Sequence, residues 1–184
     1  AEDIATRGAD AVLVADDPAL ARYTTDTWAL AIEAAVEARQ PRVVLLSGTT
    51  SGRDLGPYLA ARAGTTSLSD CVALRWDGAD LVATRQVYGG KMLADVSLPV
   101  NERAWAVVRP GSYASPEAGS ANTADTQRLT INMSAVTQRV TLRDVTAKGE
   151  GSVNLETAER IVTGGRGVGS PEGFALIEQL AAAL

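Results

Sequence analysis

Short apolar runs alternate with longer segments of helical periodicity in the first third of the chain. Residues 11–14 and 43–46 are continuous apolar runs, a pattern typical of strands covered on both faces. Residues 24–39 and 52–63 follow these runs with apolar side chains at helical spacing, and Gly64 can cap the second segment. The order strand, helix, strand, helix predicts an α/β fold with a parallel sheet.

The pattern changes after residue 70. Residues 71–76 and 81–88 are strand candidates on either side of Asp77-Gly78, where glycine tolerates the positive φ of a tight hairpin. Residues 92–98 and 103–108 are two further strand candidates. We therefore expect an antiparallel β extension after the parallel sheet.

Residues 110–145 have a weaker pattern. Gly, Ser, Ala and Pro dominate residues 110–125, which predicts a loop. Residues 128–133 and 139–145 are compatible with either a last strand pair or two extended arms. Residues 148–152, Lys-Gly-Glu-Gly-Ser, have the composition of a linker.

A second unit begins after this linker. Residues 158–163 are a strand candidate, residues 164–167 form a tight glycine turn, and a helix follows. Ser170 suits the N-cap of that helix and Pro171 its first position. Strand, turn and helix together make one β-α unit.

The glycine turn holds the candidate site residues Gly164, Gly165, Arg166 and Gly167. Glycines between a strand and a helix let backbone N–H groups approach an anion, and Arg166 can pair with a phosphate or a reduced cofactor. The dinucleotide-binding pattern is incomplete, because Ser170 stands where its third glycine belongs. On these residues alone, a cofactor site and a tight turn with a solvated Arg are equally good interpretations.

Other loops carry weaker signals. Residues 47–56 follow a predicted parallel strand, and their hydroxyls, glycines and Arg53 can cradle a nucleotide phosphate. We favour the alternative that Arg53 and Asp54 form an ion pair within the loop. Lys91 and Arg109 each lie in a turn beside a strand end, where a cation is expected to face water.

Four side chains of special interest are expected in the core. Trp28, Trp76 and Trp105 lie among apolar neighbours, which favours burial over a role in ligand stacking. Cys71 lies in the apolar run of residues 71–74 and is expected to be a buried, inert thiol.

Composition excludes several classes of site within these 184 residues, which include no histidine and one cysteine. Ser-His-Asp and Cys-His catalysis, His-ligated zinc, multi-thiolate metal sites and an internal disulfide all need residues that are missing. A formal net charge of −5 disfavours nucleic-acid binding. No apolar stretch has the length of a membrane span and no signal peptide is recognisable, so we expect a cytoplasmic bacterial protein without membrane insertion.

Five segments are distinctive when their order along the chain and the spacing between them are taken together. They are Ser47–Gly64, Ser69-Asp70, Thr84–Lys91, Val108–Gly111 and Val162–Phe174. Gly-Gly-Arg-Gly followed by Ser-Pro-Glu-Gly-Phe is the most specific stretch. Taken together, they resemble the electron transfer flavoprotein α subunit family over nearly the whole chain.

The resemblance implies a domain organisation. Residues 1–150 would be the N-terminal domain, a Rossmann-like fold of the adenine nucleotide α-hydrolase type without the family's first strand and helix. Residues 153–184 would begin the C-terminal FAD-binding domain as its first β-α unit.

The resemblance also implies a function. Members of the family pair with a β subunit and carry electrons on FAD from flavoprotein dehydrogenases, such as the acyl-CoA dehydrogenases of fatty-acid β-oxidation, to a quinone oxidoreductase. They are electron carriers, not enzymes that transform a substrate. Of the family's FAD contacts, only Arg166 maps here, within the turn of Gly164, Gly165 and Gly167. The later contacts would lie beyond Leu184.

Two other functions stay open. The chain can be a scaffold that packs on a β subunit and contributes no cofactor site of its own. A nucleotide-dependent enzyme is the third candidate, because the implied fold also serves ATP pyrophosphatases. The chain lacks the Ser-Gly-Gly-x-Asp-Ser phosphate loop of such enzymes, however, and any histidine.

Overall fold

The computed structural model describes residues 2–98, 103–116, 119, 124–145, 155 and 158–184. The chain divides into two compact units, Ala1–Leu142 and Arg143–Leu184, and each is described by itself. The predicted linker at residues 148–152 lies outside the described residues.

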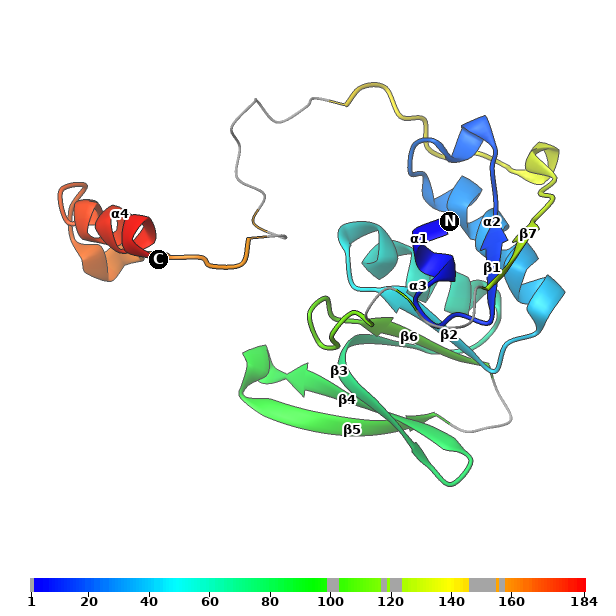
Figure 1. The fold of residues 1–184 in the computed structure, drawn as a ribbon, viewed down its shortest axis with the longest axis horizontal. Coiled ribbons are helices and arrows are strands. Elements are labelled where there is room, and N and C mark those ends of the chain that lie inside the picture. The colour runs from blue at the N-terminus through cyan, green and yellow to red at the C-terminus, as the bar shows by residue number, and fades with distance from the viewer. Residues whose placement is uncertain (1, 99–102, 117–118, 120–123, 146–154, 156–157) are drawn as a thin grey trace. The chain divides into compact units, whose positions relative to one another are not determined.

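The first unit combines helices with two sheets (Figure 1). Its helices are α1 (Glu2–Ala5), α2 (Thr25–Arg39) and α3 (Thr50–Arg62), and its strands are β1 (Ala11–Val14), β2 (Val43–Ser47), β3 (Ser67–Asp77), β4 (Asp80–Val87), β5 (Met92–Leu98), β6 (Ala104–Val108) and β7 (Asp125–Arg128). The larger sheet has the strand order β2-β6-β3-β4-β5, and β1 pairs with β7 in a separate two-stranded sheet.

The α/β class and the parallel sheet are confirmed, although β1, expected in one sheet with β2, pairs with β7 instead. β2, β6 and β3 run parallel, whereas β4 and β5 add to β3 as antiparallel strands. The hairpin turn lies one residue later than predicted: Asp77 pairs with Asp80, and Gly78 has φ 60° in the turn. Glycine at this position accepts the positive φ without strain.

The position of β6 differs from the sequence expectation. We expected residues 103–108 in the antiparallel extension, but β6 lies between β2 and β3 and runs parallel to both. The four consecutive residues Ala104, Trp105, Ala106 and Val107 are all buried. A strand buried on both faces belongs inside a sheet, where neighbouring strands satisfy both of its edges.

The segment after residue 110 also differs in part. The strand in this region is β7, Asp-Thr-Gln-Arg, which pairs with β1 although all of its side chains are exposed. Residues 129–145 form no strand and are the extended arms that we kept as an alternative to a strand pair. The hydropathy of residues 125–128 does not predict a strand. These residues form β7 only because they pair with the apolar strand β1.

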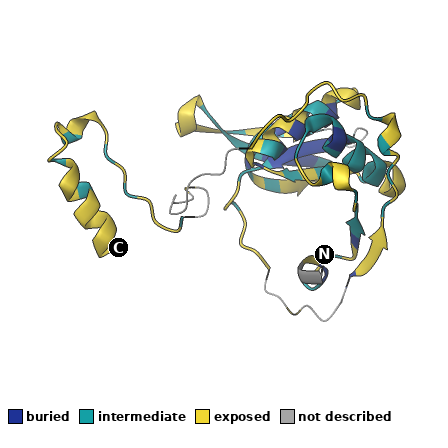
Figure 2. Cartoon of the chain, turned by 90° about the horizontal axis from the view of Figure 1, so that it is seen from above, coloured by how far each residue is buried: buried dark blue, intermediate teal, exposed yellow. Residues whose placement is uncertain are grey.

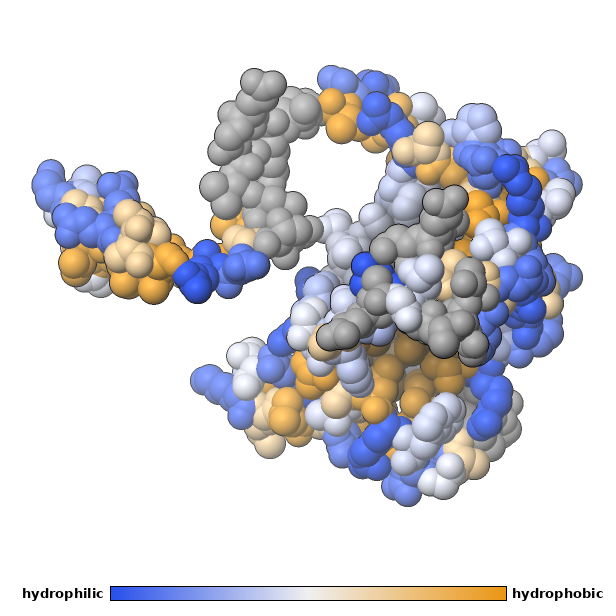
Figure 3. Space-filling model, in the orientation of Figure 1, coloured by the Kyte–Doolittle hydropathy of each residue, from blue (hydrophilic) through white to orange (hydrophobic). Residues whose placement is uncertain are grey.

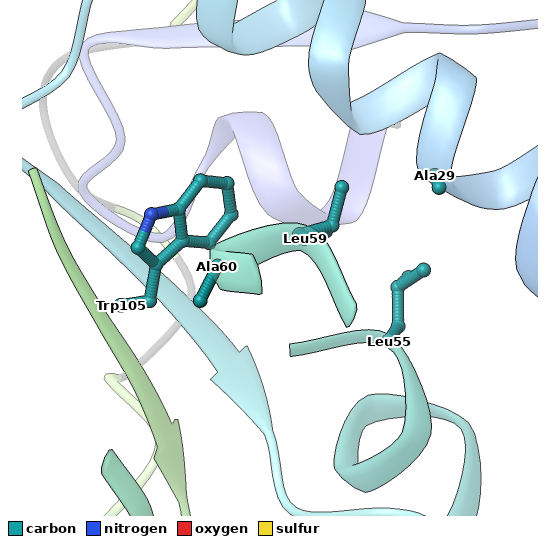
Figure 4. Packing of buried hydrophobic residues seen from close by; sticks show 5 residues of the cluster. All are labelled: Ala29, Leu55, Leu59, Ala60 and Trp105. Atoms are coloured by element: carbon teal, nitrogen blue, oxygen red, sulfur yellow. The ribbon is translucent and has the colours of Figure 1, made fainter. Parts of the chain in front are cut away.

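Helices α2 and α3 pack on one face of the sheet and enclose its main core. That core contains Ala29, Leu55, Leu59, Ala60 and Trp105 (Figure 4). Thr49 caps α3 by accepting a hydrogen bond from the Gly52 N–H at 3.2 Å. Within α3, Gly56 allows close approach to β6, because a Cβ there would lie 2.5 Å from Val107 Cγ2.

A second core lies beneath the antiparallel strands. Leu68, Cys71, Ala83 and Ala106 are buried together there, so the expected burial of Cys71 is confirmed. Burial raises the pKa of the Cys71 thiol, which keeps it protonated and unreactive.

Trp76 corrects the expectation for the tryptophans. Trp105 is buried and Trp28 packs at the edge of the main core, but Trp76 is 55% exposed. The guanidinium of Arg42 lies 5.2 Å from the centre of the Trp76 ring. Trp76 lies near the tip of the β3–β4 hairpin, where the strands extend past the core and the indole packs against a cation instead.

Among its described residues the second unit has one α-helix, α4 (Phe174–Ala183), and no residue of α4 is buried (Figure 2). The strand predicted at residues 158–163 is not formed, because the described residues offer it no neighbouring strand to pair with. The helix begins later than predicted: Ser170 accepts a hydrogen bond from the Gly173 N–H at 3.3 Å, and a turn precedes Phe174.

Candidate functional site

The glycine turn of the second unit is built around a single 3₁₀ turn, Arg166–Val168. The Val168 N–H donates to the Gly165 carbonyl and the Gly169 N–H to the Arg166 carbonyl, each at 3.1 Å. Gly169 has φ 81°, which reverses the chain toward α4. These bonds fix the loop before any ligand is considered.

Two glycines near the turn are required by packing within the chain. A Cβ on Gly164 would lie 2.9 Å from Val168 Cγ2 and 3.1 Å from both Phe174 and Ile177. A Cβ on Gly173 would lie 2.4 Å from the Val168 carbonyl oxygen. These two glycines let the loop lie against α4, so their absence of a side chain is already explained.

Gly165 and Gly167 have no such explanation. A Cβ on either residue would meet nothing within 4 Å, and neither has a positive φ. Arg166 between them is exposed and has no ion pair or hydrogen bond through its guanidinium within the described ranges. An open backbone beside an unpaired cation is a surface that a negatively charged or flat ligand can approach closely.

The first N–H groups of α4 are already hydrogen-bonded within the chain, as that of Phe174 is to the Pro171 carbonyl oxygen at 3.1 Å. The Glu172 carboxyl lies just before the helix, and hydrogen bonds from Ser170 and from its own backbone N–H lower its pKa. Because these N–H groups are engaged and a carboxylate precedes them, the open side of the loop at Arg166 is the better position for an anion.

Three segments singled out in the sequence converge in the first unit. Arg109 Nε lies 2.8 Å from Asp70 Oδ1, Arg109 Nη1 lies 2.7 Å from Gln86 Oε1, and Arg109 Nη2 also bonds Asp70. Asp70 has φ 61° at the irregularity where β3 leaves β6. The expectation that Arg109 faces water is therefore wrong: it fastens the junction between the parallel and antiparallel parts of the sheet.

The loop at residues 47–56 is also held by hydrogen bonds within the chain. Asp54 accepts hydrogen bonds from Tyr23 and Thr25, not from Arg53 as expected. Burial and the neighbouring Asp54 raise the pKa of Tyr23 to about 12. These contacts tie α3 to the start of α2, which favours a structural role for the loop.

Comparison with known proteins identifies the family. Residues 1–133 match the family described as Electron transfer flavoprotein domain. The chain belongs to the electron transfer flavoprotein family. This match covers most of the first unit, so the folded α/β part of the chain is the family's own domain.

Relatives within the electron transfer flavoprotein family align with all or nearly all of the chain. The chain is 36% identical to the electron transfer flavoprotein subunit alpha of Clostridium acetobutylicum and 35% identical to protein FixB of Clostridium saccharobutylicum, covering 100% of this chain in both cases and 56% and 55% of those proteins. It is 29% identical, over 98% of its length, to the lactate dehydrogenase (NAD(+),ferredoxin) subunit LctC of Acetobacterium woodii, of which 43% is covered. The chain thus spans about half the length of these relatives.

Sequence reasoning missed one feature of this electron transfer flavoprotein domain. An apolar hollow of about 560 Å³ opens on the sheet face opposite α2 and α3, lined by residues that include Leu45, Leu74, Val108 and Tyr113. Figure 3 shows apolar side chains gathered on the first unit between β2 and the antiparallel extension. The signal was present in the sequence, because a continuous apolar run such as that of β2 implies cover on both faces, yet Leu45 is 55% exposed.

The described residues contain no helix that is long and apolar enough to cross a membrane.

Proposed function

We propose that this chain acts as part of an electron transfer flavoprotein α subunit, an FAD-dependent electron carrier without a substrate-transforming site of its own. The observation that carries the proposal is the similarity over the full chain to a protein named as that subunit. Arg166 and its flanking glycines are then the residues of this chain that contact FAD.

The loop fits a part of FAD in two respects. Gly165 and Gly167 leave open backbone where a ligand atom can come closer than any Cβ would allow. Arg166 places a cation beside that backbone, where it can stabilise a phosphate or the negative charge of the reduced flavin. FAD would supply the electron-accepting chemistry. The two open glycines would let FAD approach the backbone, and Arg166 would polarise it. Cofactor affinity is spread over many contacts, so this loop alone would bind FAD weakly.

The proposal extends to partners. A β subunit would complete a heterodimer, flavoprotein dehydrogenases such as those of fatty-acid β-oxidation would donate electrons, and a quinone oxidoreductase would accept them. The pairing with a β subunit is supported by the family and by the α designation of its relatives. The donor and the acceptor rest on the resemblance alone, and a relative that belongs to a lactate dehydrogenase complex indicates that donors vary within the family.

The test uses the full-length α subunit that carries this chain, co-expressed with its β subunit. We expect a purified complex with a flavin absorption spectrum. Gly165→Ala and Gly167→Ala are each expected to weaken FAD retention about tenfold or more, because one displaced close contact of ~1.4 kcal/mol has that effect. Thermal unfolding of the FAD-free form should not change, because neither Cβ meets an atom of the chain.

Gly173→Ala is the matched control. Its Cβ would lie 2.4 Å from a backbone oxygen, so it should destabilise the second unit with or without FAD. A colourless complex from the unmodified proteins would refute the carrier function. Full FAD retention in both open-glycine variants would remove the loop from the cofactor site.

The scaffold function is the second candidate, and the apolar hollow beside Leu45 and Tyr113 favours it. A domain with an uncovered apolar face can hold a partner without any cofactor. In this case the chain would bind a β subunit with the same affinity whether or not FAD is present.

A further inference from the structure

An extended segment at the end of the first unit crosses the outer side of α2 and α3. We call residues 129–142 the strap. It follows β7 and runs past the N-terminal end of α2, in yellow in Figure 1. The strap matters because it is the last part of the first unit before the chain continues into the unit that carries the glycine turn.

The strap is fastened to the body of the unit at two points. At its start, the Leu129 N–H donates to the Val14 carbonyl at 2.8 Å and continues the β1–β7 pairing. At its far end, the Arg139 N–H donates to Asp26 Oδ2 at 3.0 Å, and Arg139 Nη2 lies 2.7 Å from Asp26 Oδ1. The Asp26 side chain is only 9% exposed whereas that of Arg139 is 60% exposed, so this charge-assisted contact is desolvated on the carboxylate side alone.

Tyr58 of α3 completes the far attachment. Its hydroxyl accepts a hydrogen bond from Arg139 Nη2 at 2.9 Å, and the Arg139 guanidinium lies 5.3 Å from the centre of the Tyr58 ring. Arg62 approaches the same ring at 5.7 Å, and its charge is paired with Glu33. We call the contacts of Arg139 with Asp26 and Tyr58 the latch.

The strap is poorly packed between its two attachments. A cavity of about 300 Å³ lies under it, bounded by α2 and α3 on one side and by Ala135, Val136 and Thr137 on the other. Hydrogen bonds of the intervening strap residues, within the described part of the chain, stay inside the strap, as between Ser134 N–H and Asn132 Oδ1. Apart from the partial burial of Ile131, Met133 and Val136, the latch is therefore what fastens the described part of the strap to the helices beyond Leu129.

We propose that the latch is a releasable anchor, which opens without unfolding of the domain and changes the length of the connection to the second unit. Opening moves the last fixed point from Arg139 back to Leu129. This frees ten residues, which is about 33 Å of chain when fully extended from Leu129. Under the proposed function, on which this last step rests, the latch sets how far the flavin-holding unit can extend from the first unit.

Tryptic cleavage of the native chain tests the latch directly, because Arg139 is itself a cleavage site and is engaged when the latch is closed. The cut after the exposed Arg143 is the internal reference. Asp26→Asn retains Arg139 and removes the charge from its partner. We expect the ratio of the cut after Arg139 to the cut after Arg143 to rise about tenfold or more, as for the loss of a charge-assisted hydrogen bond.

Asp16→Asn is the matched control. Asp16 pairs with Arg128 at 3.8 Å next to the other end of the strap, but both side chains are largely exposed. Such a pair contributes little, so the cleavage ratio should not change. An unchanged ratio in Asp26→Asn, or an equal rise in Asp16→Asn, overturns the proposal.

Two further measurements guard against unfolding of the variant. Tyr58→Phe removes only a hydroxyl and should raise the ratio by a smaller factor while the circular dichroism stays unchanged. In the unmodified chain, the Arg139 amide should exchange its hydrogen faster than the amides of α2; exchange only at the global unfolding rate overturns the proposal. None of these measurements involves flavin. The latch proposal can therefore be refuted while the proposed carrier function stands, and the carrier function can be refuted while the latch proposal stands.

Discussion

The glycines in the loop around Arg166 are needed for different physical reasons, and these reasons become visible only when each residue is considered separately. Gly164 and Gly173 are fixed by neighbours that a Cβ would strike, and Gly169 by its φ of 81°. Gly165 and Gly167 are required by nothing in the chain, which is why they are the residues to test for a ligand. The sequence alone presents all five as equivalent.

Trp105 gives a prediction at the same scale. It is 2% exposed, and its indole Nε1 is buried without a hydrogen-bond partner among the described residues. A buried donor without an acceptor costs about 1–3 kcal/mol. Trp105→Phe removes the donor and retains most of the apolar volume, so we expect the free energy of unfolding to stay within about 1 kcal/mol of the unmodified chain.

Trp105→Ala is the comparison. It empties the space between α2, α3 and β6 and should lose about 3–5 kcal/mol. Urea denaturation followed by far-UV circular dichroism measures both variants. If Trp105→Phe lost as much stability as Trp105→Ala, the indole N–H would have to have a partner in solution.

At the scale of elements, the parts of the fold that the sequence predicts are those with a strong local pattern. The helices at α2 and α3 follow from their apolar spacing, and the β3–β4 hairpin follows from Gly78. The place of β6 does not, because a continuous apolar run fits any strand buried on both faces and does not reveal its neighbours. β7 is undetectable for the opposite reason, since its exposed polar side chains carry no strand pattern at all.

The same limit applies to the site. Arg166 is recognisable from its local motif, whereas the latch at Arg139 depends on contacts between residues more than 80 positions apart in the sequence.

The junction between β3 and β6 yields a prediction that depends on pH. The hydrogen bonds from Arg109 lower the pKa of the Asp70 carboxyl below its usual value. A carboxyl with a lowered folded-state pKa stabilises the fold above its unfolded pKa, and the contribution is lost as pH falls through the folded value. We expect Asp70→Asn to cost roughly 1 kcal/mol or more at pH 7, and the difference from the unmodified chain to shrink as the pH is lowered toward 3.

Asp95→Asn separates this effect from a general loss of charge. Asp95 pairs with Arg75 on the exposed face of the hairpin, where both side chains are about half exposed. Such a pair is screened by water, so Asp95→Asn should destabilise the fold clearly less than Asp70→Asn does. Urea denaturation at several pH values compares the two variants, and a pH-independent cost for Asp70→Asn would contradict the assignment.

At the scale of the whole molecule, the two units differ in how far their own buried side chains can stabilise them. The first unit encloses its cores between helices and sheet, whereas α4 buries none of its side chains. A ten-residue helix that packs only against the glycine loop and has no fully buried residue is marginal in water. In the chain as given, the amides of α4 should therefore exchange their hydrogens at least about 100-fold faster than those in the middle of α3, because only the latter are protected by a core.

The same measurement connects stability to function. Phe174, Leu176 and Leu180 are exposed on α4, so their apolar surface is free to pack against further elements. In a full-length α subunit that holds FAD, we expect the α4 amides to become protected and the loop at Arg166 to be protected further when FAD is added. Fast exchange of α4 in that complex would mean that the second unit does not form the cofactor lobe. Protection of α4 already in the 184-residue chain would mean that its apolar side finds a partner within the chain, and the glycine loop would then have to be explained without a flavin-holding unit.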